Sequence, residues 1–324
     1  MTLTALTPEG VVTDHFHEPV MAGQVLELLD PSGTGVYLDA TVGGGGHTRR
    51  ILEACGGCSV VAVDRDARAL SEAAGSLDDL AYRIRFIEGS FDAVAQTLVE
   101  DAPGSFAGAL LDLGVSSHQL DEDGRGFAFR RGVPLDMRMS ADADDVPTAA
   151  DLLNEADVER LRTIFRQYGE EPRAARLARE IVRRRDRHSF ATSDDLVAAL
   201  STTLERAPSQ RDKARIFQAV RIAVNGELEA LELALPSIRG LLSDGGTLVV
   251  ISYHSLEDRA VKRAFREWSA SCVCPPKLPI CVCRGRSLGR TLTSKPLRPT
   301  DAEVLSNPRS RSARLRAWTK MEAA

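Results

Sequence analysis

Short apolar runs alternate with amphipathic stretches through the first half of the chain. Each run is bounded by turn residues, and the residues after it carry apolar positions at helical spacing, which is typical of strands followed by helices. The four predicted strands cover residues 36–42, 59–64, 83–91 and 106–117. Strands that alternate with helices favour β-α-β units. We therefore predict an α/β fold with a doubly wound, Rossmann-like parallel sheet.

The pattern changes near residue 148. From there to about residue 207 the apolar spacing is helical throughout, with breaks at Pro172 and at Thr192. A single long helix is predicted over 214–235, and the strand pattern returns at 245–255. The sheet domain is thus predicted to be interrupted by a helical insertion domain. The predicted boundaries are 1–140 for the first part of the sheet domain, 141–214 for the insertion, and 215–324 for the second part with a basic C-terminal tail.

Four consecutive glycines follow the first predicted strand. A dinucleotide-binding G-x-G-x-x-G would need glycine where the chain has Thr48 or Arg49, and a phosphate-binding P-loop needs a lysine that is missing. What remains is an acid-x-x-x-Gly-x-Gly pattern from Asp39 to Gly45, with Asp64 ending the next strand 19 residues later. That interval suits a carboxylate that binds ribose hydroxyls. The loop resembles the first motif of the S-adenosylmethionine-dependent methyltransferases; a plain flexible turn is the alternative.

The ends of the other predicted strands converge on the same crevice. Ligands of open parallel sheets bind outside the carboxyl ends of the strands, near the point where the strand order reverses. Phe91 stands at the end of the third predicted strand, and Asp112 ends the apolar run ALLD of the fourth. Phe91 is a candidate to cover a cofactor and Asp112 to bind one; for Phe91 a core role is the alternative. His254 follows the last strand, before a helix-capping sequence.

The total charge of −5 conceals two basic regions. Residues 284–320 contain ten Lys and Arg against two acids, a net charge of +8, and residues 160–187 contain ten Arg against four acids, a net charge of +6. Charge runs are often only solvated faces. Two of them in an acidic chain favour a phosphate-rich partner.

Several strings together are similar to the bacterial 16S ribosomal RNA cytosine-N4 methyltransferases. They are HEPV (17–20), DATVGGGGHT (39–48), DLGVSSHQLD (112–121), RGFAFR with GVPLDMRM (125–139), YGEE (168–171), FQAVRIAVNGELEAL (217–231), ISYHSLEDRAVKRAF (251–265) and NPRSRSARLR (307–316). The resemblance implies methyl transfer from S-adenosylmethionine to the exocyclic amine of a decoding-centre cytidine, in free 16S rRNA or in the small ribosomal subunit. It also implies cofactor contacts by Gly45, Gly46, His47, Asp64, Phe91, Asp112 and Gln119. His118 stands where the family often has proline, which leaves the loop path near Gln119 open.

The cytosine amine is a poor nucleophile, because its lone pair is delocalised into the ring. Hydrogen-bond acceptors near the amine and an in-line methyl sulfonium would position that pair for attack, after which a proton must leave. Asp112 and the following serines are candidate acceptors, although cofactor binding is the favoured role of Asp112. His254 is the candidate proton acceptor. A structural histidine bonded to a backbone carbonyl is the alternative.

Aromatic and cationic residues are interleaved just after the crevice. RNA readers stack bases on aromatic rings and hold phosphates with cations, and an enzyme that acts on a base must reach it unstacked. The equal alternative is that the two phenylalanines anchor a loop to the core. The residues are Arg125, Phe127, Phe129, Arg130, Arg131 and Arg138. On the helix that follows, Phe217 and Leu228 suit packing, whereas Arg221 and Asn225 could line the substrate cleft.

Cysteines occur in two symmetric C-x-C elements, formed by Cys272 with Cys274 and by Cys281 with Cys283. Thiolate clusters bind zinc, although C-x-x-C is the commoner spacing, so a structural metal, reduced thiols and, least favoured, a disulfide are all open. Cys55 and Cys58 are predicted to pack in the core.

The chain has no membrane-length apolar stretch and no leader pattern, so we expect a cytoplasmic protein without a membrane partner. The alternative functions are a methyltransferase that acts on another RNA, on DNA or on a small molecule, and a non-enzymatic RNA-binding assembly factor. The glycine loop with its two acids argues against the last.

Overall fold

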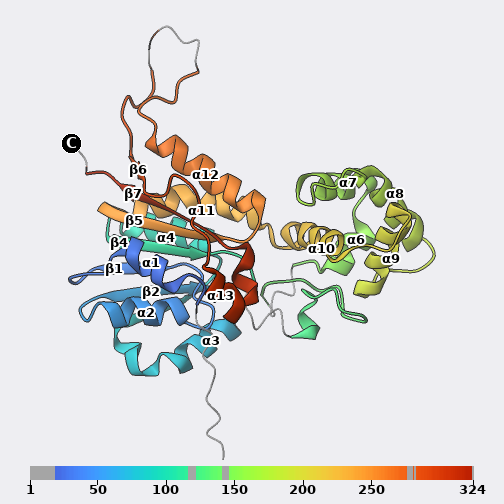
Figure 1. The fold of residues 1–324 in the computed structure, drawn as a ribbon, viewed down its shortest axis with the longest axis horizontal. Helices are drawn as coiled ribbons and strands as arrows, with labels where there is room; N and C mark the ends of the chain where they lie inside the picture. The colour runs from blue at the N-terminus through green and yellow to red at the C-terminus, as the bar shows by residue number, and fades with distance from the viewer. Residues whose placement is uncertain (1–18, 116–121, 141–145, 276–279, 281, 323–324) are drawn as a thin grey trace, which may run out of the picture.

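A seven-stranded sheet forms the centre of the computed structural model, which describes residues 19–115, 122–140, 146–275, 280 and 282–322 (Figure 1). The strand order is β3-β2-β1-β4-β5-β7-β6. Strands β1 to β5 are parallel, and β7 runs antiparallel to its two neighbours, β5 and β6. The predicted α/β fold is therefore confirmed. The strands are β1 (Val36–Asp39), β2 (Ser59–Asp64), β3 (Ile84–Glu88), β4 (Phe106–Asp112), β5 (Leu242–Ser252), β6 (Gly289–Thr291) and β7 (Arg314–Lys320).

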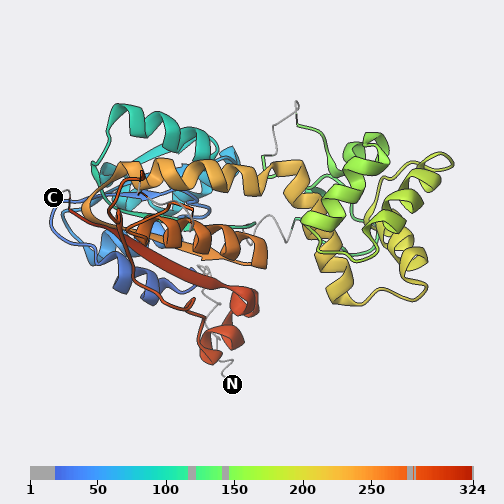
Figure 2. The ribbon, with the colours of Figure 1, turned by 90° about the horizontal axis from the view of Figure 1, so that it is seen from above.

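Helices cover both faces of the sheet, because the strand side chains are apolar on both sides. In β2, for example, Val60 and Ala62 join one buried cluster while Val61 and Val63 join the other. One face is covered by α1 (Ala22–Leu29), α2 (Gly46–Ala54) and α3 (Ala67–Ser76), with the 3-10 turn η1 (Asp78–Arg83). The other is covered by α4 (Phe91–Asp101), α11 (Glu227–Leu241) and α12 (Ser255–Ser269) (Figure 2). The sheet is thus doubly wound.

The strand order reverses between β1 and β4. β1 pairs with β2 on one side and with β4 on the other, so the connections after β1 and β4 diverge at the carboxyl edge of the sheet. In open α/β sheets, ligands bind at such a reversal, in the crevice expected between the two connections. The glycine loop predicted from the sequence lies at this reversal.

The predicted third strand and the predicted long helix differ from the elements observed. The third strand ends at Glu88, and Phe91 begins α4 instead of ending the strand. The long helix predicted over 214–235 is two helices, α10 (Gln210–Asn225) and α11, because Gly226 adopts a left-handed φ of +62° that ends α10. That break turns the chain from the helical unit back to the sheet (Figure 2).

A separate helical unit lies beside the sheet (Figure 1). It contains α6 (Ala149–Glu155), α7 (Val158–Gln167), α8 (Ala174–Arg185), α9 (Ser193–Leu204) and α10. Its buried core also takes in Phe127 and Leu135 before these helices and Phe217 in α10, together with Met137 and Met139. The domain boundaries at 141 and 214 stay a prediction. The buried core of the helical unit contains residues from both sides of each boundary.

The basic C-terminal region is built into the sheet. β7 pairs with β5 along six residues and β6 with β7 along three, and Trp318 is fully buried. Sequence patterning missed both strands because arginines interrupt the apolar alternation in 314–320. Between the two strands lie α13 (Asp301–Ser306) and the 3-10 turn η3 (Pro308–Ser312); a further 3-10 turn, η2, covers Asp123–Arg125.

Cys55 and Cys58 are buried and joined by a disulfide, with Cα atoms 5.5 Å apart. The core position agrees with the sequence analysis, which did not predict the disulfide. The turn after α2 brings the two residues close, which the spacing of three residues does not reveal. Within the described ranges, no helix is long and apolar enough to cross a membrane.

Candidate active site

The glycine loop joins β1 to α2 and contacts the end of β2. Gly45 is the N-cap of α2 and has a φ of +86°, and a Cβ added there would lie 2.7 Å from Leu77 Cδ1. Both the backbone angle and the lack of space therefore require glycine. The N–H of Gly43 donates to Asp64 Oδ2 over 2.9 Å. The two features that the sequence singled out, the loop and the acid, are thus in direct contact.

Asp64 ends β2 with its carboxylate held by backbone amides. Besides Gly43, the N–H of Asp66 donates to Oδ1 at 3.0 Å. Burial raises the pKa of Asp64 above its ordinary value of 3.8, and these two amide donors offset only part of that effect. A carboxylate has about four acceptor positions, so a ligand hydroxyl can bind without displacing either amide.

Asp112 at the end of β4 connects the loop to the last parallel strand. Its Oδ1 accepts a hydrogen bond of 2.9 Å from the Tyr253 hydroxyl, and its Oδ2 lies 3.4 Å from His47 Nε2. Its own N–H donates to Thr41 Oγ1 at 2.7 Å. Three of the predicted site residues, His47, Asp64 and Asp112, therefore surround one glycine loop. We call them, with Asp39 and Tyr253, the crevice cluster.

Tyr253 was missed by the sequence analysis. Burial and the negative charge of Asp112 raise the pKa of Tyr253 well above its ordinary value of 10. The phenol therefore stays protonated and donates a hydrogen bond to the Asp112 carboxylate. The signal that would have found it is its place directly after β5, at the same sheet edge as Asp64 and Asp112.

Asp39, the acid of the glycine motif, is 1% exposed and serves the loop itself. The Thr48 hydroxyl donates to Oδ2 at 2.7 Å, which ties the end of β1 to the first turn of α2. Burial raises the pKa of Asp39 above 3.8, and the neighbouring His47 opposes this shift. Gly46 starts the helix under Pro19, whose Cβ lies 3.2 Å from where a Gly46 Cβ would stand.

Phe91 and Gln119 are the remaining predicted cofactor residues. Phe91 is the first residue of α4 and is partly buried against the core beneath the sheet, which is the alternative role that the sequence analysis left open. Its contact with a cofactor stays a prediction. Gln119 lies outside the described residues, as does His118.

His254 caps α12. Its Nδ1 accepts from the Glu257 N–H at 3.4 Å, the Glu257 carboxylate accepts from the His254 N–H at 3.2 Å, and Nε2 lies 3.1 Å from Glu257 Oε1. The alternative predicted for this histidine, a bond to a backbone carbonyl, is wrong; the partner is an amide. Both ring nitrogens face Glu257. The role of proton acceptor stays a prediction.

Arg221 and Glu227 complete a second buried group around His254. The Arg221 guanidinium donates to both Glu227 oxygens, at 2.8 and 2.7 Å, across the break between α10 and α11. Burial alone would raise the pKa of Glu257, but His254 and then Arg221 outweigh it and hold the pKa below 4.5. We call Arg221, Glu227, His254 and Glu257 the helix-junction cluster. Its two carboxylates thus meet one guanidinium and one imidazole.

The Asn225 side chain forms structural hydrogen bonds between α10 and residues 137–139, so its predicted place in the substrate cleft is not supported. Its Oδ1 accepts from the Met139 N–H at 2.8 Å, and its Nδ2 donates to the Met137 carbonyl at 2.7 Å. The amide group is thereby used to hold the segment that follows the crevice against α10. Arg221 is likewise engaged by Glu227.

The interleaved aromatics are core anchors. Phe127 is buried in the helical unit, and the Phe129 ring packs edge-on against Phe217 with centroids 5.7 Å apart. Arg125 is 6% exposed and pairs with Asp66 at 3.0 Å. The base-stacking hypothesis is therefore wrong for these rings, and the loop-anchor alternative holds. Arg130 and Arg131 remain exposed.

Comparison with known proteins identifies the family. The model of the MraW methylase family matches residues 14–321. A protein of Gemmatimonas aurantiaca called ribosomal RNA small subunit methyltransferase H is 52% identical over 324 residues, which cover 98% of this chain and 99% of that protein. Proteins of the same name from Heliobacterium modesticaldum and Geobacter sulfurreducens are 45% and 46% identical over 310 residues, which cover 94% of this chain and 98% and 99% of theirs. The chain belongs to the MraW methylase family.

Proposed function

We propose that this protein transfers a methyl group from S-adenosylmethionine to the exocyclic N4 amine of a cytidine in 16S ribosomal RNA. The observation that carries the proposal is the crevice cluster, in which Asp64 and Asp112 flank a glycine loop at the strand reversal. Carboxylates repel a phosphate group but attract a cation. A sulfonium cofactor with ribose hydroxyls suits such a crevice better than a nucleotide does. The names of the full-length relatives support the ribosomal substrate.

The residues of this chain would bind and orient the cofactor. Gly45 and Gly46 leave the backbone accessible at the start of α2, and Asp64 offers acceptors for the ribose. Asp112 is held in place by the Tyr253 hydroxyl and lies next to His47. The cofactor, when bound, supplies an electrophilic methyl group. Phe91 and Gln119 stay predicted contacts.

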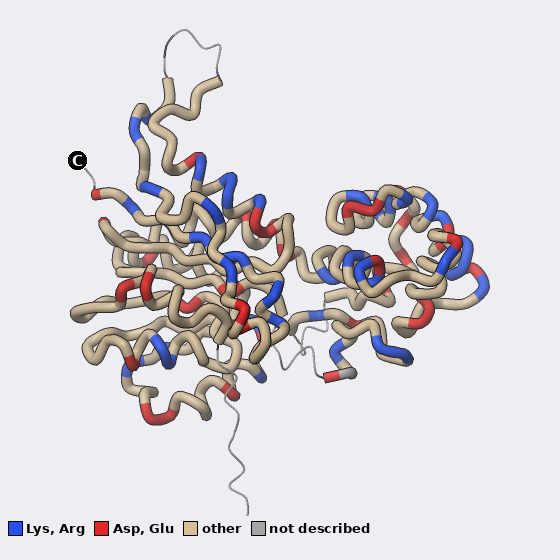
Figure 3. The backbone as a smooth tube through the Cα atoms, viewed as in Figure 1, with Lys and Arg blue, Asp and Glu red and all other residues tan. Residues whose placement is uncertain are grey.

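The RNA would contact the helical unit as well as the sheet. On α7 and α8 and in the residues after α8, the side chains of Arg160, Arg166, Arg179 and Arg187 are exposed, and basic residues follow the outer side of this unit (Figure 3). Phosphate contacts by arginine supply affinity that falls with salt. The C-terminal region contributes less than its sequence charge suggests, because Arg314 and Arg316 pair with Asp258. Action on ribosomal RNA would place the protein in the cytoplasm.

Labelled methyl transfer tests the proposal. The substrates are small ribosomal subunits and naked 16S rRNA from cells that lack this methylation, with duplex DNA as the competing class. After digestion to nucleosides, the label should lie in N4-methylcytidine, and fully methylated subunits should take up none. Label in another nucleoside or in DNA would contradict the substrate assignment. No transfer to any of them, despite cofactor binding, would favour a non-enzymatic assembly factor.

A further inference from the structure

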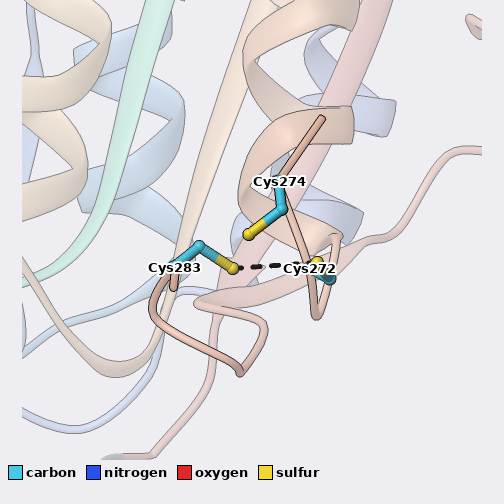
Figure 4. A group of neighbouring side chains, drawn as sticks. All are labelled: Cys272, Cys274 and Cys283. Carbon is cyan, nitrogen blue, oxygen red and sulfur yellow. Dashed lines mark hydrogen bonds between the residues drawn. The ribbon is translucent and has the colours of Figure 1, made fainter. Parts of the chain in front are cut away.

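Three cysteine sulfurs lie close together in the segment between α12 and β6, outside the crevice cluster. Cys272 and Cys274 follow α12, and Cys283 lies shortly before β6 (Figure 4). Their sulfur atoms all lie within 4.8 Å of one another. Cys281, the fourth member of the sequence pattern, lies outside the described residues. We propose that Cys272, Cys274 and Cys283 bind a structural Zn²⁺ ion.

The spacing of the sulfurs suits tetrahedral zinc. Cys272 Sγ and Cys283 Sγ are 3.8 Å apart, nearly twice the length of a disulfide bond. Zn–S bonds of about 2.3 Å at tetrahedral angles place two sulfur ligands about 3.8 Å apart. We call residues 272–274 and 282–284 the two arms of this segment. The arms already hold a pair of sulfur ligands at the separation that zinc requires.

Backbone amides also point at the sulfurs, in a reciprocal arrangement. The Val273 N–H donates to Cys283 Sγ and the Val282 N–H donates to Cys274 Sγ, each over 3.4 Å. Each arm thus offers an amide to a sulfur of the other arm. Donors of this kind stabilise the negative charge of a thiolate, which is the form that binds metal.

Apolar packing does not explain why the arms meet. The hydrophobic side chains beside these cysteines face solvent: Val273 is 41% exposed, Ile280 74% and Val282 77%. At the base, the Arg284 guanidinium donates to the carbonyls of Glu267 and Ala270, which fixes one arm to the end of α12. A metal ion bound by the three sulfurs would hold the two arms together farther from α12, as it does in small zinc-bound loops.

Sulfur ligands select zinc, copper(I) or iron–sulfur clusters and exclude magnesium and calcium. Tetrahedral zinc needs one more ligand than the three sulfurs described, and a water molecule or a further thiol meets that need. A structural ion at this place would order a segment next to the basic residues Arg284 and Arg286. The site lies apart from the glycine loop, so it takes no part in cofactor binding.

Metal content of the purified full-length protein tests the site. Protein made in zinc-supplemented medium and purified without chelator should contain about one zinc per chain by inductively coupled plasma mass spectrometry. Cys272→Ser combined with Cys283→Ser should lose that zinc to background. Cys55→Ala combined with Cys58→Ala is the matched control: it removes the other cysteine pair, which has the commoner zinc spacing, and it should keep the ion.

Cobalt substitution provides a second readout. The wild-type protein should show the charge-transfer bands of thiolate-bound Co²⁺, and the Cys272 and Cys283 double variant should not. Zinc that persists in this double variant, zinc lost from the Cys55 and Cys58 variant instead, or purified wild-type protein that holds no metal or holds iron or copper would each overturn the proposal. Failure here would leave methyl transfer by the crevice untouched.

Discussion

Two groups of buried charged residues lie near the carboxyl edge of the sheet, and their charges are arranged in opposite ways. In the helix-junction cluster the acids meet Arg221 and His254, and the pKa of Glu257 falls below its ordinary value. In the crevice cluster the acids meet amides, hydroxyls and the His47 ring but no arginine or lysine among the described residues, and burial raises the pKa values of Asp39 and Asp64. The acids of the first cluster are thus engaged by a guanidinium of the protein. We propose that those of the second attract the cationic cofactor.

The largest effect that tests this contrast is expected from Arg221→Met. Methionine preserves much of the side-chain volume but leaves Glu227, whose side chain is 8% exposed, without its cation. Removing one partner of a buried ion pair costs about 3–5 kcal/mol. We expect that loss in the free energy of unfolding, measured by urea denaturation.

Arg259→Met is the matched control for Arg221→Met. Arg259 pairs with Glu170, but the two side chains are 65% and 52% exposed, so the change should stay within about 0.5 kcal/mol. Equal losses in the two variants would mean that the helix-junction cluster is no more than a surface ion pair. The contrast with the crevice cluster would then fail.

The next largest effect concerns the crevice cluster and cofactor affinity. Gly45→Ala places a side chain in a left-handed conformation against Leu77, which costs about 1–3 kcal/mol. If this strain falls on the loop that holds the cofactor, affinity should drop roughly 10- to 100-fold, as measured by isothermal titration calorimetry.

Gly44→Ala is the control for the loop. Its added Cβ would lie 3.7 Å from Glu72 Oε1, an ordinary contact, and Gly44 has no positive φ. Affinity should therefore change less than about threefold. If both alanine variants bind the cofactor alike, the shape of the loop is not what selects the ligand.

The sequence was sufficient for the parts of the site that depend on local pattern. The glycine loop, Asp64 and Asp112 could be placed because strand ends in a parallel sheet share one edge. Phe91 was assigned to a strand end because the predicted strand was extended through 83–91, past the polar residues 88–90 that follow the apolar alternation. Such boundaries depend on pairing with β2, which sequence spacing does not encode.

Contacts between distant segments were beyond the sequence pattern. Tyr253 meets Asp112 across 141 positions, and Asn225 meets Met139 across 86. The local pattern of Arg125 and Phe129, which mixes cations with aromatics, left RNA contact and core anchoring equally open, because their partners Asp66 and Phe217 are supplied by other elements. Polar and aromatic side chains are ambiguous until those partners are known. The strands of the C-terminal region were missed for a similar reason, since β7 is defined by pairing with β5.

The smallest effect is expected from His254→Asn, and it tests the contrast from the other side. Asparagine is among the best N-cap residues, so the cap of α12 is kept, and only the contact of Nε2 with Glu257 is lost. We expect a stability loss of about 1 kcal/mol and unchanged cofactor affinity. Turnover then decides the role that is still a prediction: a reduction of less than about threefold would exclude His254 as the proton acceptor and leave it as a helix cap. His254→Ala, which removes the cap as well, should cost about 1 kcal/mol more. A turnover loss of about 100-fold or more in His254→Asn, with cofactor affinity retained, would instead identify His254 as the proton acceptor. The helix-junction cluster would then take part in the chemistry, and the contacts with Glu257 would serve to position that histidine.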